Sequence, residues 1–392
     1  MFFVSSTNAE DSKMFSFNVP DLKEGKIQID EKGRYHLFVQ NVAVERLSDS
    51  QFAAMRQYDE ALQKKTDKKS KQKSRALVVA IARSGSAKSL LYLHEQFETY
   101  SERRNNVAEG LSYYAREKKL RDSDWRLLVR SLNVVEGKQA EEVIDALLRF
   151  RRRANKAQWI RQLIIIGLSL EEKGASKAVK LVEHWMGRKT VKPTESAKGD
   201  LGIWQKVFAK RYPDAPPAAL PVDAKKSKWK YNRLHAILSK HQYDQIDLEQ
   251  GKKIFTKASC IKCHRLGEEG EKIGPNLTTI SRKMQRKEIL KAILFPSHFI
   301  PEEYPTTTLE TKGGKTYTGM MGASGPEVLL ILGLDGKKVF IKKKDVKNIV
   351  PNKISAMPEK LLEELSQEEI IQLFGYIQSF TKQKTIGFHK QK

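Results

Sequence analysis

The sequence predicts a mainly α-helical chain that carries a small β section close to its C-terminal end. Three observations lead to this fold class. Between residues 76 and 212, apolar residues recur every three or four positions, which is the spacing of one helix face. Residues 303–351 instead alternate around Gly-containing pairs, a pattern typical of hairpins. A second helical section surrounds that β stretch, and a chain of 392 residues favours two or three domains.

The first section, residues 1–75, is interpreted as an N-terminal segment with a basic linker. Residues 15–19 and 35–42 have extended patterns, and one helix is expected to start near Ser48. The cationic run Lys64–Lys73 is typical of a solvated linker or an exposed helix end. Met1–Val4 is too short for the apolar core of a signal peptide, so we expect such a peptide to have been removed or to be missing from the sequence. An ordinary N-terminal tail is the alternative.

Residues 76–212 are predicted to be a helical-repeat domain. Similar phrases follow Gly-containing turns at Ala87–Leu91, Ala140–Ile144 and Ser176–Val179. Irregular self-similarity of this kind resembles degenerate HEAT-like helix pairs stacked in a solenoid. A non-repetitive helical bundle remains the alternative. Residues 213–246 are then expected to form a Pro-rich connector and one helix.

The strongest motif is Cys260-Ile261-Lys262-Cys263-His264, the attachment pattern for c-type haem. Two thiols one turn apart can each add to a haem vinyl group, and the adjacent imidazole can bind the iron. These are the chain's only two cysteines, so a zinc ribbon lacks half of its ligands. A thioredoxin-like pair would not be followed directly by histidine. We therefore expect one covalently attached haem c, anchored by Cys260 and Cys263 and ligated by His264.

Two helices flank the motif. The upstream helix is predicted to start at Asp247, with Gln250 three residues on. The C-terminal helix is predicted from a capping box of Ser366 and Glu369. The apolar face of the upstream helix holds Gly251, Ile254, Phe255 and Ala258, and that of the C-terminal helix Ile370, Leu373, Phe374, Ile377 and Phe380. The order of helix, haem motif, Gly-Pro turn, Met loop and closing helix resembles a class I cytochrome c.

Residues 247–392 are expected to form the haem domain, and within them residues from about 247 to 381 resemble, more specifically, the haem-binding domain first described from planctomycete and verrucomicrobial proteins. The matching pieces are Gly251–Phe255, Cys260–Gly267, Gly274–Leu277, Glu288–Ser297 and Ser355–Pro358. The resemblance implies Met357 as the second axial iron ligand, although a Met is more often core filler. It also implies that the Pro275 carbonyl accepts the His264 Nδ1 proton. His298 is the rival ligand. Met/His ligation suits one-electron transfer.

Five short strands are expected between the haem motif and Met357. They cover 304–311, 315–321, 327–332, 338–342 and 346–350, with turns at Gly313-Gly314 and Asp335-Gly336. They predict a small inserted barrel of the SH3 or Sm type, or else a simple β-meander. Lys342–Lys344 and Lys347 would place positive charge on this insert, as a docking face for a partner protein.

The formal charge of +25 would ordinarily favour nucleic-acid binding. Covalent haem attachment takes place outside the bacterial inner membrane, so we expect no nucleic-acid partner and a periplasmic or other extracytoplasmic location. The charge then favours acidic redox partners or peripheral contact with anionic lipid. No apolar run is long enough to span a bilayer.

The expected function is that of an exported monohaem cytochrome, an electron carrier rather than an enzyme. Two alternatives stay open. One is a haem enzyme or small-molecule sensor with a displaceable sixth ligand. The other is a helical-repeat scaffold in which the haem domain is an accessory.

Overall fold

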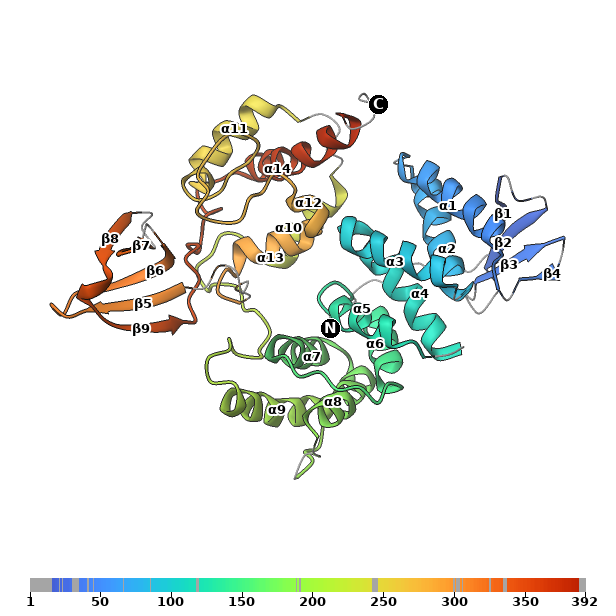
Figure 1. Cartoon of the computed structure of the whole chain (residues 1–392), viewed down its shortest axis with the longest axis horizontal. Coiled ribbons are helices and arrows are strands. Elements are labelled where there is room, and N and C mark those ends of the chain that lie inside the picture. Colours follow the sequence, from blue (N-terminus) through green and yellow to red (C-terminus); the bar gives the residue numbers. More distant parts are fainter. Residues whose placement is uncertain are drawn as a thin grey trace. The chain divides into compact units, whose positions relative to one another are not determined.

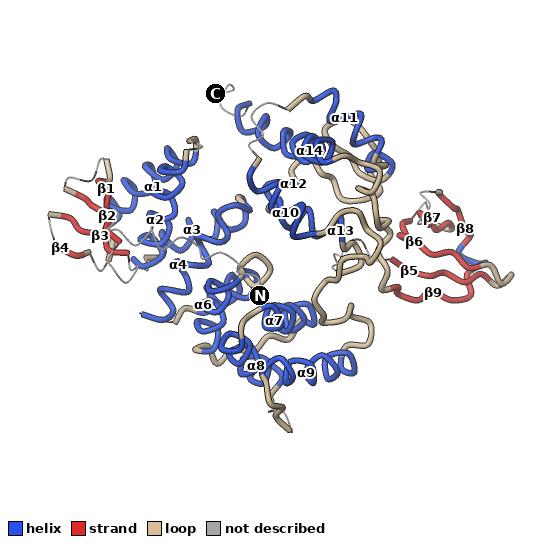
Figure 2. Tube along the Cα trace, turned by 180° about the vertical axis from the view of Figure 1, so that it is seen from behind, coloured by secondary structure: helices blue, strands red, loops and turns tan. Residues whose placement is uncertain are grey.

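The computed structural model describes residues 16–387, except 21, 23, 30–34, 41, 45, 66, 85, 118–119, 188, 190–191, 242–245, 299, 301–303, 305, 324–325 and 334–336. It divides into two compact units, residues 1–202 and 203–392, with the order of elements drawn in Figure 1. Helices dominate both units, which confirms the mainly α prediction (Figure 2). The signal-peptide expectation and the Asp335-Gly336 turn lie outside the described residues. Within them, no helix is long and apolar enough to cross a membrane.

The first unit begins with a four-stranded antiparallel sheet. Its strands follow the chain order, and each pairs with the next. They are β1 (Ser16–Asn18), β2 (Gly25–Ile29), β3 (Tyr35–Val39) and β4 (Val42–Ala43). Phe17, Ile27 and Leu37 are buried and alternate with less buried residues, as expected for a sheet with one face packed on a core.

Helix α1 (Asp49–Gln63) starts directly after Ser48, near which the sequence predicted a helix start. Ser48 Oγ accepts the Gln51 N–H at 3.2 Å, and Gln51 Oε1 accepts the Ser48 N–H at 2.8 Å, so two otherwise unpaired donors are satisfied. Helix α2 (Lys68–Ser84) starts inside the basic run Lys64–Lys73. Ser70 within this run is buried, and Ser74 directly after the run is buried and donates to Asp59 Oδ1 at 2.6 Å, so part of this run is packed helix, not linker.

Seven further helices follow. They are α3 (Ala87–Thr99), α4 (Arg104–Glu117), α5 (Asp122–Ser131), α6 (Gly137–Leu148), α7 (Ala157–Ser169), α8 (Glu172–Met186) and α9 (Ala197–Arg211), with a 3₁₀ turn, η2 (Ser101–Arg103), before α4. The even-numbered helices pack in succession, α2 on α4, α4 on α6 and α6 on α8. The odd-numbered α3, α5 and α7 pack against their chain neighbours. Trp125 stands edge-on to Trp159 and Trp185, with ring centroids 5.6 and 6.5 Å apart.

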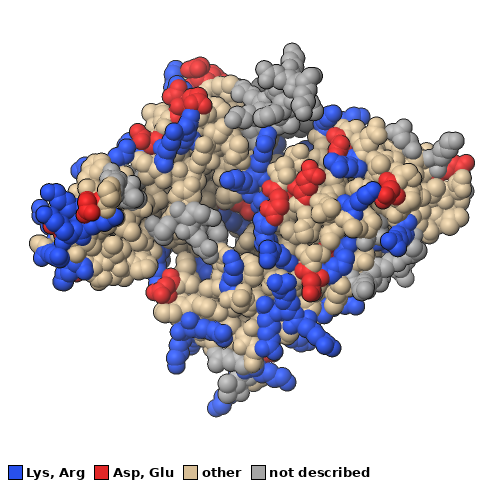
Figure 3. All heavy atoms as spheres, viewed as in Figure 1, with Lys and Arg blue, Asp and Glu red and all other residues tan. Residues whose placement is uncertain are grey.

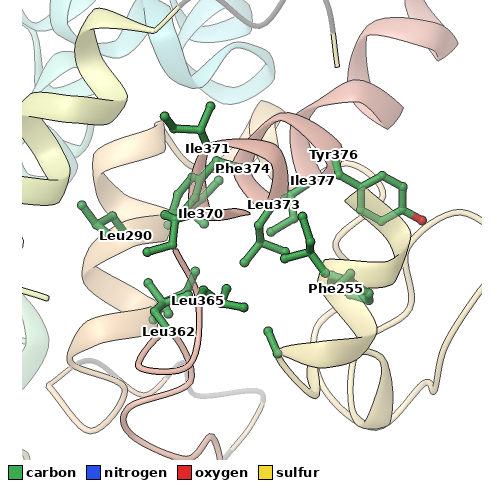
Figure 4. Packing of buried hydrophobic residues seen from close by; sticks show 14 of the residues in the cluster. Phe255, Leu290, Leu362, Leu365, Ile370, Ile371, Leu373, Phe374, Tyr376 and Ile377 are labelled. Atoms are coloured by element: carbon green, nitrogen blue, oxygen red, sulfur yellow. The ribbon is translucent and has the colours of Figure 1, made fainter. Parts of the chain in front are cut away.

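The second unit continues with five helices among its described residues, and they include the two flanking helices and the connector helix that the sequence predicted. They are α10 (Tyr231–Lys240), α11 (Leu248–Lys257), α12 (Ile280–Lys283), α13 (Arg286–Leu294) and α14 (Gln367–Gly387). Both predicted caps are confirmed: Asp247 Oδ1 accepts the Gln250 N–H at 3.0 Å, and Ser366 exchanges hydrogen bonds with Glu369. The apolar faces of α11, α13 and α14 meet in one core, part of which is shown in Figure 4.

Helices α11 and α14 approach each other most closely at Gly251. A Cβ at this position would lie 2.5 Å from Tyr376 Cβ, a separation that side chains do not tolerate. One turn further along α11, Phe255 stacks edge-on against Tyr376 at 5.9 Å between centroids (Figure 4). The missing side chain of Gly251 therefore sets the distance between the two helices.

The same core extends further upstream than the sequence indicated. Trp229, Leu234 and Leu238 are buried in it, at 3%, 0% and 1% exposure. Arg286 on α13 fixes α10 from the other side, because its guanidinium donates to Leu238 O at 2.6 Å and to Gln378 Oε1 at 3.0 Å. Residues 229–238 therefore pack as part of the second helical core.

The inserted strands form one antiparallel sheet in the order β8-β7-β6-β5-β9. They are β5 (Thr306–Thr311), β6 (Thr316–Ala323), β7 (Val328–Gly333), β8 (Lys338–Lys342) and β9 (Val346–Asn352), and a 3₁₀ turn, η4 (Lys343–Asp345), precedes β9. Among the described residues β8 and β9 do not pair, so the sheet is open and the barrel prediction is not met. Instead, strands β5 to β8 form an antiparallel meander, and β9 pairs with the free side of β5. Among the described residues of this sheet, the buried apolar side chains are those of Leu309, Ile331 and Ile341, too few to fill the interior of a closed barrel.

Replacing Gly251 by Ala should destabilise the second unit. The added methyl group overlaps Tyr376, and overpacking of this kind costs about 1–3 kcal/mol, more than the ~1 kcal/mol that Ala gains over Gly in a helix. Chemical denaturation measures the change. Gly313→Ala is the matched control, since its Cβ would meet nothing within 4 Å. Equal unfolding midpoints for the two variants would contradict the close crossing.

Candidate haem-attachment site

The Cys-x-x-Cys-His motif folds into one tight turn directly after α11. Residues Cys260–Lys262 form a 3₁₀ turn, η3, which Ser259 enters with a left-handed backbone, φ 60°. Cys260 O accepts the N–H groups of Cys263 at 3.2 Å and His264 at 2.9 Å. Both cysteines are unpaired thiols, half-buried at the edge of the apolar core. The turn thus brings two thiols and one imidazole within a single loop of chain.

The imidazole of His264 is oriented by a backbone carbonyl. Its Nδ1 lies 2.8 Å from Pro275 O, the contact that the sequence analysis expected. A carbonyl oxygen can only accept, so Nδ1 carries the proton and Nε2 keeps its lone pair. The Gly274 N–H donates to Cys263 O at 2.7 Å, and the Leu277 N–H donates to Arg265 O at 2.8 Å, so the Gly-Pro turn is fastened to the motif. His264 is therefore held in the tautomer whose Nε2 can bind a metal ion.

Gly274 lies flat against the His264 ring. A Cβ built on Gly274 would lie 2.9 Å from His264 Cε1 and 3.0 Å from Nδ1. Its backbone does not have a positive φ, so the requirement for glycine here is one of space, not of conformation. Any larger residue would turn the ring or lengthen the bond to Pro275 O.

Burial determines the protonation states of the two cysteines and the histidine in the motif. Burial raises the pKa of Cys260 to about 12 and raises the pKa of Cys263 above its usual value. Burial lowers the pKa of His264, although the bond to Pro275 O opposes this shift. At neutral pH the turn therefore holds two neutral thiols and a neutral imidazole.

Met357 is half-buried and packs against the same apolar core as Cys260. Its backbone N–H donates to Ser355 Oγ at 3.1 Å, and the Ser355 N–H donates to Ser297 Oγ at 3.1 Å. Pro358 follows Met357 and restricts its backbone to extended conformations. The Met357 segment is therefore fastened to the loop after α13.

Beyond Met357, the chain is held by the segment before α10. The Glu363 carboxylate accepts hydrogen bonds from the Ser227 hydroxyl and, at 2.9 Å, from the Lys228 N–H. Lys228 Nζ donates to Leu365 O at 2.9 Å, and Leu365 itself is buried. The sequence analysis missed this contact because it treated residues 213–246 as a connector. The apolar spacing of Trp229, Leu234 and Leu238 was the available signal.

The rival ligands lie on neighbouring segments. His298 directly follows Ser297, and its N–H donates to Phe295 O at 2.9 Å. The Met357 and His298 segments are thus hydrogen-bonded to each other through Ser297. Met284, at the end of α12, also packs against the core.

The residues present fit a covalently attached haem. The turn supplies two free thiols beside an imidazole whose Nε2 is available, and both border an apolar core. No group of three or more His, Cys, Asp and Glu side chains is gathered for another metal in the part of the chain that the structure describes. When bound, the group would be anchored by Cys260 and Cys263 and ligated by His264.

Comparison with known proteins agrees with this geometry. Residues 248–381, about one third of the chain, match the model of the Cytochrome c family. No curated protein matches the chain. The match supports a cytochrome c-like haem-binding domain in the second unit, implies covalently bound haem c, and suggests an electron-transfer protein with redox partners.

Replacing Gly274 by Ala should weaken ligation by His264. The added methyl group would press on Cε1 and Nδ1 and turn the imidazole away from Pro275 O. We expect a larger high-spin fraction in the absorption spectrum of the oxidised holoprotein at neutral pH. Gly313→Ala, a control with open space around the new methyl group, should leave the spectrum unchanged. A fully low-spin Gly274→Ala protein would contradict the close contact.

Proposed function

We propose that this chain is an exported monohaem c-type cytochrome that passes single electrons between protein partners. The observation that carries the proposal is the hydrogen bond between His264 Nδ1 and Pro275 O, inside a Cys-x-x-Cys-His turn. It leaves Nε2 as the one free ring nitrogen, beside two thiols at the spacing that haem attachment requires. The cytochrome c match over the same residues supports this proposal.

Each site residue has a defined task. Cys260 and Cys263 would form the thioether anchors, and His264 Nε2 and Met357 Sδ would ligate the iron. When bound, haem c supplies a one-electron Fe(III)/Fe(II) couple. Methionine as the second ligand raises the potential relative to a second histidine. With both axial positions filled by the protein, small molecules have no open site, which favours transfer over substrate chemistry.

The surrounding core keeps water away from the ligands. The helices α11, α13 and α14 contribute fully buried apolar residues, among them Phe255, Leu290 and Phe374 (Figure 4). An apolar shell controls solvent access and the local dielectric, and both set the potential of a metal group. Little reorganisation is then needed when the charge of the group changes, which suits rapid transfer.

The lysine-rich insert is proposed to receive an acidic redox partner. Residues 337–344 hold five lysines and no acidic residue. Within the described part of the chain, no ion pair engages Lys342 or Lys344, whereas Lys347 pairs with Glu310 at 2.7 Å. Figure 3 shows Lys and Arg gathered at the outer end of this sheet. Uncompensated positive charge speeds encounter with an acidic surface.

The sheet is also linked to the haem motif. Lys338 Nζ on β8 lies 3.2 Å from Glu271 Oε2. The Glu271 N–H in turn donates to Ile261 O, between the two cysteines, at 3.2 Å. A partner that docks on β8 would therefore lie near the turn that carries the thioether bonds, which supports a role in transfer.

The successive packing of α2, α4, α6 and α8 supports a HEAT-like repeat in residues 76–212. The extracytoplasmic location follows from where covalent haem attachment takes place. The likeness of residues 247–392 to the planctomycete-type haem-binding domain rests on the motifs quoted above.

Absorption spectra of the purified holoprotein test the ligand pair. We expect sharp reduced α and β bands of low-spin haem c and, in the oxidised form, a weak red band from thioether ligation that Met357→Ala abolishes. Met284→Leu, a volume-conserving control on the same core, should keep the band. A band that persists in Met357→Ala would refute the assignment. Rapid carbon monoxide binding by the reduced wild-type protein would instead favour an enzyme or sensor.

Charge reversal on the insert tests the docking face. Lys342→Glu with Lys344→Glu should slow electron transfer to an acidic redox protein such as flavodoxin by about tenfold at low salt, and the difference should vanish at high salt as charges are screened. Stopped-flow kinetics measure the rates. Lys225→Glu with Lys226→Glu changes the net charge equally at exposed positions before Trp229 and serves as the control. Equal rates for the two double variants would contradict this face.

A further inference from the structure

Two serines connect Met357 to the helical core. The first is Ser297, which is placed by α13, the helix that buries Ile289, Leu290 and Ile293 in the core. Its Oγ accepts the Ser355 N–H at 3.1 Å, and Ser355 Oγ accepts the Met357 N–H at 3.1 Å. In each of the two bonds, a serine side-chain oxygen accepts a backbone N–H group, so the bonds connect the end of α13 to Met357 through Ser355.

These bonds also close the base of the inserted sheet. Ser297 precedes β5 and Ser355 follows β9, so the whole sheet is a loop whose two ends meet at the Ser297–Ser355 bond. The ladder between β5 and β9, which pairs Thr306 with Asn352, already holds the two ends of the sheet together, and the Ser297–Ser355 bond joins them to the loop after α13. Without the bond, the chain entering the Met357 segment is free to move with the sheet.

Met357 has little other backbone support on its N-terminal side. Pro358 limits its ψ to extended values but does not fix where the residue lies. The bonds of Glu363 and the burial of Leu362 and Leu365 hold only the chain that follows. Of the contacts between described residues, the two serine bonds are the ones that place Met357 from the preceding side.

We propose that Ser297 and Ser355 are positioning residues for the sixth iron ligand, Met357, and that they couple this ligand to the base of the β insert. The inference rests on the proposed function, because it takes Met357 as a ligand. Loss of either hydroxyl leaves Met357 in the chain but lets its segment move, so the sulfur is displaced more readily by an external ligand.

The test is competition by imidazole for the iron of the oxidised holoprotein, followed by absorption. A hydrogen bond of this kind contributes about 0.5–1.5 kcal/mol, so Ser297→Ala and Ser355→Ala should each tighten imidazole binding by roughly 2- to 12-fold. Met357→Ala, which removes the competing sulfur, sets the upper limit. Ser355→Thr keeps an oxygen on Cβ and should restore wild-type binding. Ser239→Ala removes an exposed hydroxyl that bonds His235 O on α10, and should change nothing.

The outcomes separate this inference from the proposed function. If Met357→Ala binds imidazole far more tightly while both serine variants match the wild type, Met357 is the ligand and the positioning role is wrong. If Met357→Ala itself matches the wild type, the ligand assignment fails, and the inference fails with it. A merely structural role would lower the thermal midpoint of Ser297→Ala and Ser355→Ala without changing imidazole affinity. If Ser355→Ala cannot be purified with haem, imidazole binding by Ser297→Ala tests the same proposal, because that variant removes the acceptor of the Ser355 N–H.

Discussion

The hydrogen bond between His264 Nδ1 and Pro275 O is the contact on which the site depends. It selects the tautomer that leaves Nε2 free, and it fixes the direction in which the ring points. Its geometry rests in turn on Gly274, whose missing side chain lets the Gly-Pro turn lie against the ring. The Gly274 N–H completes the arrangement by bonding Cys263 O at 2.7 Å, within the motif itself.

The core around the motif explains why this turn is presented as it is. Gly251 allows α11 to cross α14 closely, and the motif follows directly where α11 ends. Phe255 and Tyr376 fill the crossing with edge-on rings. Because the thiols come one short turn after this contact, the position of the attachment site is set by the packing of two helices and not by a flexible loop.

Features that depend on short spacings could be predicted from the sequence. The caps at Asp247 and Ser366 and the five inserted strands need only neighbours a few residues away. The contacts of Glu363 with Ser227 and Lys228 span more than 130 positions and carry no pattern that one sequence reveals. The barrel prediction failed for a related reason. The alternating pattern predicts the strands and their turns, but a barrel closes only if the two edge strands, here β8 and β9, pair with each other. Local alternation does not encode that pairing.

The two proposed iron ligands are therefore held in physically different ways. His264 is oriented by contacts within one short stretch, from Cys260 to Leu277, so its geometry requires little of the remaining fold. Met357 is placed by contacts with distant segments, through Ser297 on one side and Ser227 and Lys228 on the other. Contacts that close long loops form only when the whole domain is folded. Ligation by methionine therefore depends on more of the fold than ligation by histidine does. The sixth ligand is consequently the position at which the surrounding protein, including the inserted sheet, can adjust the properties of the iron.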